Sequence, residues 1–200
     1  VSLAPEVLGP EVAIVLRPGD QLFMLDSSWA EISQFVPIFE AVRAVGGSII
    51  GVVYDLIPIR HPAVCHQVVL DAFEPWVREM IRHVDGIVCI SKSVADDLVA
   101  HMAELGANDR AVPRVSWAHL GADLPSLTAA SIRPELQRFM VDPEPFCLMV
   151  GTLEPRKGHA VVLDAFERLW SQGSQARLCI LGRNGWSMDV VVRRIPVEEG

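Results

Sequence analysis

The sequence has no apolar run long enough to cross a membrane and no cluster of basic residues. None of its hydrophobic stretches approaches the roughly 20 residues that span a bilayer, and its first residues lack the charged and apolar pattern of a signal peptide. It has 17 basic against 25 acidic residues, a formal net charge of −8. These features argue against a transmembrane segment, secretion and nucleic-acid binding. We therefore expect a soluble, cytoplasmic protein.

Cysteine is scarce, and its spacing suits no zinc site. The four cysteines lie far apart, which favours free, buried thiols. Three of them stand inside apolar runs: Cys89, Cys147 and Cys179. His61, Cys65 and His66 form the one cluster that suggests metal ligands. Because no second pair at zinc-site spacing follows, we expect neither a metal nor another cofactor.

The sequence does have enough apolar residues for a sizeable core, since they make up half of its 200 residues. Short apolar runs alternate with stretches of helical period, which is typical of βαβ units around a parallel sheet. The expected strands are 22–25, 49–54, 87–90, 115–118, 146–150 and 177–181. The expected helices are 32–45, a stretch around 76–84 with Pro75 in its first turn, 92–105 with Ser91 as N-cap, and 159–172. The pattern predicts an α/β protein, with Asp26, Asp55 and Ser91 at the carboxyl ends of strands, where α/β proteins bind ligands.

Residues 121–145 interrupt this pattern. The periodicity weakens there, prolines recur, and a short helix is expected at 134–140. We expect residues 1–120 to form the latter part of one Rossmann-like domain, 121–145 a linker, and 146–200 the first part of a second Rossmann-like domain. Because the chain starts without methionine and stops after an apolar and basic stretch, we expect a fragment of a longer protein.

One turn carries residues suited to a phosphate ligand. Gly151-Thr152-Leu153-Glu154-Pro155-Arg156-Lys157-Gly158 joins a strand to a helix, and its glycines allow close approach of a ligand to the backbone. Arg156 and Lys157 add two charges before the positive end of that helix, which suits a diphosphate. The turn matches neither the P-loop nor the dinucleotide fingerprint. A solvated turn that happens to carry two basic residues is the alternative.

Five segments in order resemble glycosyltransferase family 4, retaining enzymes of the GT-B fold, and most of all the bacterial mannosyl- and rhamnosyltransferases of O-antigen and related polysaccharides. The segments are 54–62 (YDLIPIRHP), 85–93 (DGIVCISKS), 119–123 (HLGAD), 150–166 and 181–186 (LGRNGW). The resemblance implies two Rossmann-like domains, both incomplete here. The first would hold the acceptor and the second the nucleotide sugar.

The resemblance also implies roles for individual residues. Arg156 and Lys157 match the basic pair that stabilises the leaving diphosphate, so they are the candidate catalytic residues. Donor binding falls to the turn and to the end of the next strand, at Gly151, Thr152, Gly158 and Gly182. Many members carry arginine at the position of Thr152 and a His-Asp pair at the position of Tyr54 and Asp55. Asp55 is therefore a tentative catalytic residue, with turn formation as the alternative role.

By resemblance, the whole protein would transfer a hexose to a glycan or lipid-linked glycan acceptor, with retention of configuration at the anomeric carbon. The first candidate for the hexose is mannose, with GDP-mannose as the donor. The reaction would need no metal and would take place in the cytoplasm. Peripheral association of the whole protein with the membrane is left open. The family's Glu-x7-Glu motif has no suitable match before the chain ends at Gly200, since Glu198 and Glu199 come too early in the domain. We therefore expect this chain alone to be inactive. The alternatives are a GT-B epimerase or phosphorylase, and a non-catalytic binding module.

Overall fold

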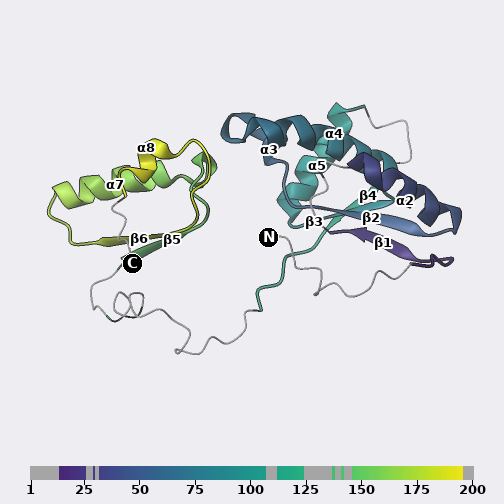
Figure 1. Cartoon of the computed structure of the whole chain (residues 1–200), viewed down its shortest axis with the longest axis horizontal. Helices are drawn as coiled ribbons and strands as arrows, with labels where there is room; N and C mark the ends of the chain where they lie inside the picture. Colours follow the sequence, from purple (N-terminus) through teal and green to yellow (C-terminus); the bar gives the residue numbers. More distant parts are fainter. Residues whose placement is uncertain are drawn as a thin grey trace. The chain divides into compact units, whose positions relative to one another are not determined.

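The computed structural model describes residues 14–25, 29, 32–106, 112–123, 137, 141 and 146–195. The chain divides into two compact units, both drawn in Figure 1. The first contains Val1–Arg60 and Val68–Leu120, and the second contains His61–Gln67 and Gly121–Gly200. Asp26 and most of the expected short helix at 134–140 lie outside the described residues.

The first unit is built on a four-stranded parallel sheet with strands in the order β1-β2-β3-β4. The strands are β1 Gln21–Met24, β2 Ser48–Val53, β3 Gly86–Cys89 and β4 Arg114–Trp117. The connecting helices are α2 Ile32–Ala44, α4 Gln67–His83 and α5 Lys92–Glu104, with the short helices α3 Ile57–Arg60 and η1 Pro62–Val64 before α4 in the chain. Because such crossovers are right-handed, a sequential strand order places the three long helices on one face of the sheet. Figure 1 shows α2 and α4 on that common face.

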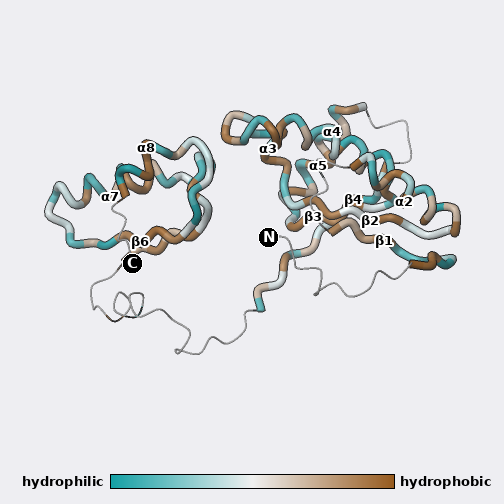
Figure 2. Tube along the Cα trace, in the orientation of Figure 1, coloured by the Kyte–Doolittle hydropathy of each residue, from teal (hydrophilic) through white to brown (hydrophobic). Residues whose placement is uncertain are grey.

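Apolar side chains from the strands and from one side of each long helix form the core of this unit. The largest fully buried side chains include Phe39 of α2, Ile49 of β2 and Leu98 of α5. Along the helices, hydrophobic and hydrophilic residues alternate in Figure 2, whereas the strands are mainly hydrophobic. The helical period therefore places the apolar residues of each helix against the sheet.

Helix α4 begins earlier than expected. The prediction that Pro75 stands in its first turn is wrong, because the helix begins at Gln67 and Pro75 lies inside it. A proline in a helix interior costs about 3 kcal/mol. Burial of Phe73, Trp76 and Met80 on the face of α4 that meets the core offsets that cost.

The second unit contains two parallel strands, β5 Phe146–Val150 and β6 Arg177–Leu181. Between them run the 3-10 helix η4 Pro155–Lys157 and the helix α7 His159–Ser171. The short helix α8 Asp189–Val192 follows β6 and lies on the same side of the strands as α7 (Figure 1). A small core joins these elements through Leu153, Leu163, Met188 and Val191.

The segment that follows α8 is fixed to α7 by charge. Arg194 lies 2.6 Å from a carboxylate oxygen of Asp164 and 3.0 Å from one of Glu167. Hydrogen bonds to these two carboxylates, with that to Glu167 the stronger cause, raise the pKa of Arg194. The apolar and basic residues near the end of the described chain thus have a structural role in this unit.

The cysteines differ in exposure. Cys89 is buried, as expected, but Cys147 is exposed, so the prediction of a buried thiol is wrong there. Strand β5 has only β6 as a neighbour in the described part of the chain, and Leu148 and Val150 of the same strand are also exposed. An apolar run in the sequence therefore did not guarantee burial in this small sheet.

Candidate donor-binding turn and comparison with known proteins

The candidate site of the second unit is the turn between β5 and α7. Gly151 has a φ angle of +151° and Gly158 one of +75°, backbone conformations that favour glycine. Gly158 is the N-cap of α7, and no side chain among the described residues caps that helix. The first turn of α7 therefore offers backbone N–H groups and the positive end of the helix dipole to an anion.

The turn after β6 is hydrogen-bonded to this one. The N–H of Gly151 donates to the carbonyl of Leu181 at 2.9 Å, and that of Leu153 donates to the carbonyl of Arg183 at 2.8 Å. In return, the N–H of Gly185 donates to the carbonyl of Leu153 at 3.0 Å. The two turns at the carboxyl ends of the strands thus form one hydrogen-bonded backbone platform.

Two glycines of the second turn make this close approach possible. A Cβ atom on Gly182 would stand 1.9 Å from the carbonyl oxygen of Gly151, and one on Gly185 would stand 2.4 Å from that of Leu153. Position 182 therefore requires a glycine, because the neighbouring peptide leaves no room for a side chain. Its expected closeness to a nucleotide stays a prediction.

The two basic residues of the turn have different surroundings. Arg156 Nη2 lies 2.5 Å from Oε1 of Glu154, whose side chain is only 3% exposed. The Lys157 side chain makes no hydrogen bond or ion pair with the residues that the structure describes. Its Cδ and Cε atoms lie 3.9 Å from where a Cβ of Gly151 would be. Within the described part of the chain, the turn therefore holds one paired cation and one unpaired cation, beside exposed Thr152.

Three residues of this region have no role in the sequence interpretation: Glu154, His159 and Gly185. His159, the first residue of α7, is 1% exposed, and neither ring nitrogen has a hydrogen-bond partner in the described structure. The position of Glu154, two residues before an arginine, is the one sequence signal for the ion pair. Its burial could not be predicted from the turn sequence, because acidic residues in turns are usually solvated.

Tyr54 and Asp55 stand at the carboxyl end of β2 in the first unit. The Tyr54 hydroxyl donates to the carbonyl of Leu25 at 2.9 Å, so it ties the end of β1 to that of β2. Asp55 Oδ1 accepts a hydrogen bond from the N–H of Ile57 at 3.0 Å. This is the turn-forming role that the sequence interpretation kept as the alternative. A contact of Asp55 with sugars stays a prediction.

The residues after β3 have mainly structural roles. Ser91 Oγ accepts a hydrogen bond from the N–H of Val94 at 3.3 Å, which confirms the predicted N-cap of α5. The Lys92 ammonium lies 2.7 Å from a carboxylate oxygen of Asp96, one turn further along the exposed face of the helix. Lys92 is thus a solvated surface residue.

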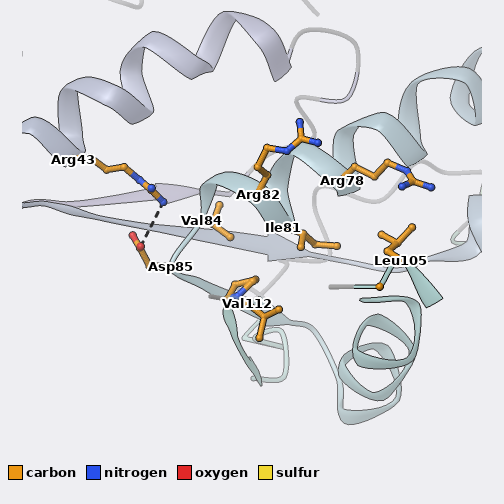
Figure 3. A pocket seen from close by; sticks show the side chains of 10 residues that line it. Arg43, Arg78, Ile81, Arg82, Val84, Asp85, Leu105 and Val112 are labelled. Carbon is orange, nitrogen blue, oxygen red and sulfur yellow. Dashed lines mark ion pairs between the residues drawn. The ribbon is translucent and has the colours of Figure 1, made fainter. Parts of the chain in front are cut away.

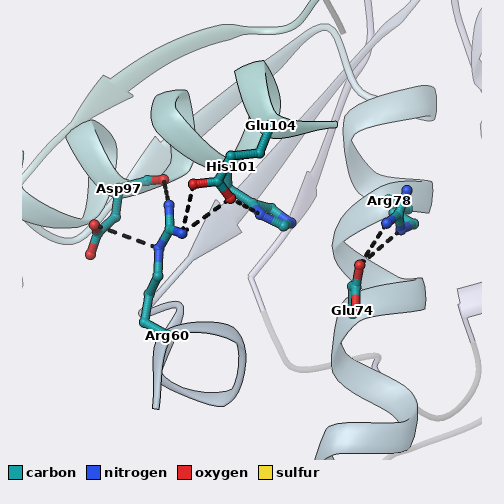
Figure 4. Close-up of polar contacts among 6 residues, drawn as sticks. All are labelled: Arg60, Glu74, Arg78, Asp97, His101 and Glu104. Atoms are coloured by element: carbon teal, nitrogen blue, oxygen red, sulfur yellow. Dashed lines mark hydrogen bonds and ion pairs between the residues drawn. The ribbon is translucent and has the colours of Figure 1, made fainter. Parts of the chain in front are cut away.

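Arg60 connects the segment after β2 to helix α5, as Figure 4 shows. Its guanidinium lies 2.9 Å from Glu104 Oε1 and 3.8 Å from Asp97 Oδ1. Glu104 also contacts Nδ1 of the buried His101 at 3.2 Å. Hydrogen bonds from Arg60 and His101 hold the pKa of Glu104 below its usual value. This network fixes the loop that begins with Asp55.

A pocket of about 610 Å³ opens at the opposite, amino-terminal edge of the first sheet (Figure 3). Arg43, Arg78 and Arg82 line it together with Asp85 and apolar residues. Arg43 donates to the carbonyl of His83 at 2.7 Å, at the last residue of α4, and lies 3.6 Å from Asp85. Arg43 and Arg82 lie in the last turns of α2 and α4, where cations stabilise a helix, and Arg78 pairs with Glu74 within α4, so these arginines have a structural explanation.

The described residues contain neither a metal site nor a membrane-spanning helix. No group of three or more His, Cys, Asp or Glu side chains in the described ranges has the arrangement of a metal site. No helix within those ranges is long and apolar enough to span a membrane.

Comparison with known proteins places the turn in a family. Residues 136–193 match the family described as glycosyl transferases group 1. The chain is 32% identical over 196 residues to a serotype-specific mannosyltransferase WbdA of Escherichia coli, a match that covers 96% of this chain and 24% of that protein. A second protein with that name and organism matches at the same identity, with 23% of its length covered. No solved structure matches the chain significantly.

The chain thus spans about a quarter of the length of the curated relatives it matches. The matched residues include β5, the turn Gly151–Gly158, α7 and β6. The parallel α/β architecture of the structure agrees with that family. Residues 136–193 thus match the group 1 glycosyl transferases, and the chain as a whole is similar to a part of the serotype-specific mannosyltransferases.

Proposed function

We propose that the protein containing this chain is a retaining glycosyltransferase that moves a hexose from a nucleotide sugar to a glycan acceptor. The observation that carries the proposal is the turn Gly151–Gly158. It presents Lys157, which has no partner among the described residues, and the start of α7, which no described side chain caps, at the carboxyl end of a parallel strand. Mannose is the first candidate for the sugar, because the curated relatives that the chain matches are named mannosyltransferases.

The chemistry of such a transfer is dominated by departure of the nucleoside diphosphate. Negative charge builds on its phosphate oxygens as the bond to the anomeric carbon breaks. Lys157 would stabilise that charge directly, and the N–H groups at the start of α7 would stabilise it through hydrogen bonds. Charge that grows in the transition state is stabilised more than the ground state, so these groups would raise the rate.

The other residues of the platform would bind the donor. Gly151 and Gly158 keep side chains away from the phosphates, and Thr152 is exposed and can donate a hydrogen bond without adding charge. Gly182 holds the second turn against the first. Because Lys157 and α7 supply the positive charge, the proposed reaction needs no metal ion.

The acceptor would be a glycan or a lipid-linked glycan, and it would bind to the first unit. Asp55, at the end of β2, would border its site. We place the reaction in the cytoplasm, with peripheral attachment to the membrane where the acceptor is lipid-linked. GDP-mannose is the expected donor, ahead of dTDP-rhamnose and UDP-sugars.

The test uses the full-length protein in a thermal-shift panel of GDP-, dTDP- and UDP-sugars, followed by turnover with the donor that stabilises it most. Lys157→Ala should abolish most of the shift and lower kcat by about 100-fold, the usual effect of losing a group that stabilises transition-state charge. Lys92→Ala is the matched control, since Lys92 is a surface lysine paired within its own helix.

Equal shifts for Lys157→Ala and the unaltered protein would contradict the proposed role of Lys157. Retention is checked separately, by the anomeric configuration of the first product in a proton NMR spectrum. An inverted product would overturn the retaining mechanism without touching the donor site.

A further inference from the structure

The turn of the donor site contains a buried carboxylate, Glu154. Its side chain is 3% exposed, while the Arg156 side chain beside it is 35% exposed. A buried carboxylate is costly unless a counter-charge or hydrogen-bond donors accompany it. Its oxygen Oε1 lies 2.5 Å from Arg156 Nη2 and has no hydrogen-bond partner within the described parts of the chain. The guanidinium of Arg156 is thus the counter-charge that this carboxylate needs.

The pairing is favoured by the local backbone. Glu154 has an extended conformation (φ −146°, ψ 154°) and precedes η4, and its side chain caps no backbone N–H of that helix. Lys157 N–H donates to the Glu154 carbonyl at 3.0 Å, which closes the 3-10 turn. The carboxylate is therefore not occupied by helix capping, and it faces the arginine two residues later.

The charges of the turn are consequently divided. Glu154 and Arg156 together are neutral, so the net positive charge of the turn is that of Lys157. Arginine carries five N–H donors in a planar fork, and a carboxylate on one nitrogen orients the others. Arg156 can therefore offer hydrogen bonds to a phosphate in a fixed direction, although it adds no net charge.

We propose that Glu154 is a positioning residue of the donor site, which holds the guanidinium of Arg156 in place for the diphosphate while Lys157 supplies the charge. This inference rests on the proposed function. It separates the two basic residues, to which the sequence interpretation gave the same role. It also predicts that Glu154 acts on the donor only through Arg156.

The test is a double-mutant cycle in the full-length protein with Glu154→Gln, Arg156→Ala and the combined variant. The probe is whichever of GDP, UDP and dTDP the unaltered protein binds most tightly, with the matching nucleoside monophosphate as reference. Affinities are measured by calorimetry and Tm by thermal unfolding. Lys157→Ala is measured beside them as the variant that removes the charge.

We expect Glu154→Gln to weaken diphosphate binding about threefold to tenfold, in the range of one hydrogen bond to a charged group. Binding of the monophosphate should change less. A general loosening of the unit would instead weaken the binding of both probes alike. In the Arg156→Ala background the same substitution should have no further effect on diphosphate affinity. Arg156→Ala should also lower Tm by stranding the buried carboxylate, and adding Glu154→Gln should restore part of that loss.

An equal loss from Glu154→Gln with and without Arg156 would overturn the proposal, and so would an unchanged diphosphate affinity. If no nucleoside diphosphate binds the unaltered protein, the proposed function itself fails. The Tm cycle would then still show whether the ion pair exists, so the two failures are distinguishable.

Discussion

Gly182 lies directly against the peptide of Gly151, where a Cβ atom would stand 1.9 Å from the carbonyl oxygen. The two residues follow neighbouring parallel strands, β6 and β5. Their contact joins the turn that carries Lys157 to the turn after β6. The stability of the second unit should therefore depend on the absence of a side chain at Gly182.

Gly182→Ala should lower the stability of the second unit, because the obstructing atom belongs to the backbone and the two turns must separate. Overpacking of this kind costs about 1–3 kcal/mol. Urea unfolding followed by a probe in the second unit would measure the loss. Gly86→Ala is the control, since its Cβ would meet the Arg114 carbonyl oxygen at an ordinary 3.5 Å. Equal stability of the two variants would contradict the prediction.

Gly51→Ala should disturb the packing of α4 on the first sheet. A Cβ at Gly51 would stand 2.2 Å from Cε of Met80, which is 1% exposed. The obstructing atom is the end of a flexible side chain, so we expect a cost of about 1–2 kcal/mol and relief when Met80 is shortened to valine in the same protein. Chemical denaturation of the single and double variants tests this. Purely additive losses would show that Met80 is not the cause.

Asp55→Asn should leave the fold unchanged, because the amide oxygen of asparagine can still accept the hydrogen bond from the N–H of Ile57. Asp55→Ala should destabilise the fold by about 1 kcal/mol, because alanine cannot accept that hydrogen bond. Tm separates the two variants. If Asp55 also contacts sugars, Asp55→Asn should lower turnover without lowering Tm. Unchanged turnover would leave Asp55 with the turn-forming role alone.

The ion pairs around Arg60 should make stability depend on pH in the acidic range. The pKa of Glu104 is lowered in the folded protein, so its contribution is present above the unfolded value near 4.5 and is lost as pH falls through the lower folded value. Arg60→Ala should lower Tm at about pH 6 and flatten the fall of Tm toward about pH 3. Arg78→Ala is the control, because Arg78 pairs with Glu74 on one exposed helix face (Figure 4). Parallel curves for both variants would count against the network.

The thiol of Cys89 should resist alkylation in the folded protein. Burial raises its pKa from 9.0 to about 11. The unfolded thiol ionises at lower pH than the folded one, so its contribution to stability is complete below about pH 9 and is lost as pH rises through about 11. Mass spectrometry after iodoacetamide treatment should find Cys89 modified only when denaturant is present. Rapid labelling under native conditions would mean that the first core opens readily.

Much of the local structure could be predicted from the sequence, because periodicity and turn residues act over short distances. The strand at 146–150 and the one at 177–181 agree with the structure at both ends. The N-cap at Ser91 was predicted from residue type alone. The start of α4 was missed, because packing of its apolar face decided that boundary against the usual effect of Pro75.

For the candidate site, the sequence by itself determined that a glycine-bounded turn with Arg156 and Lys157 links a strand to a helix. The tertiary structure decided which of the two cations is paired, because the burial of Glu154 depends on how the turn packs in the second unit. It also decided why Gly182 is glycine and why Cys147 is exposed. Such properties depend on contacts between residues distant in sequence, and a local pattern contains no information about the distance between them.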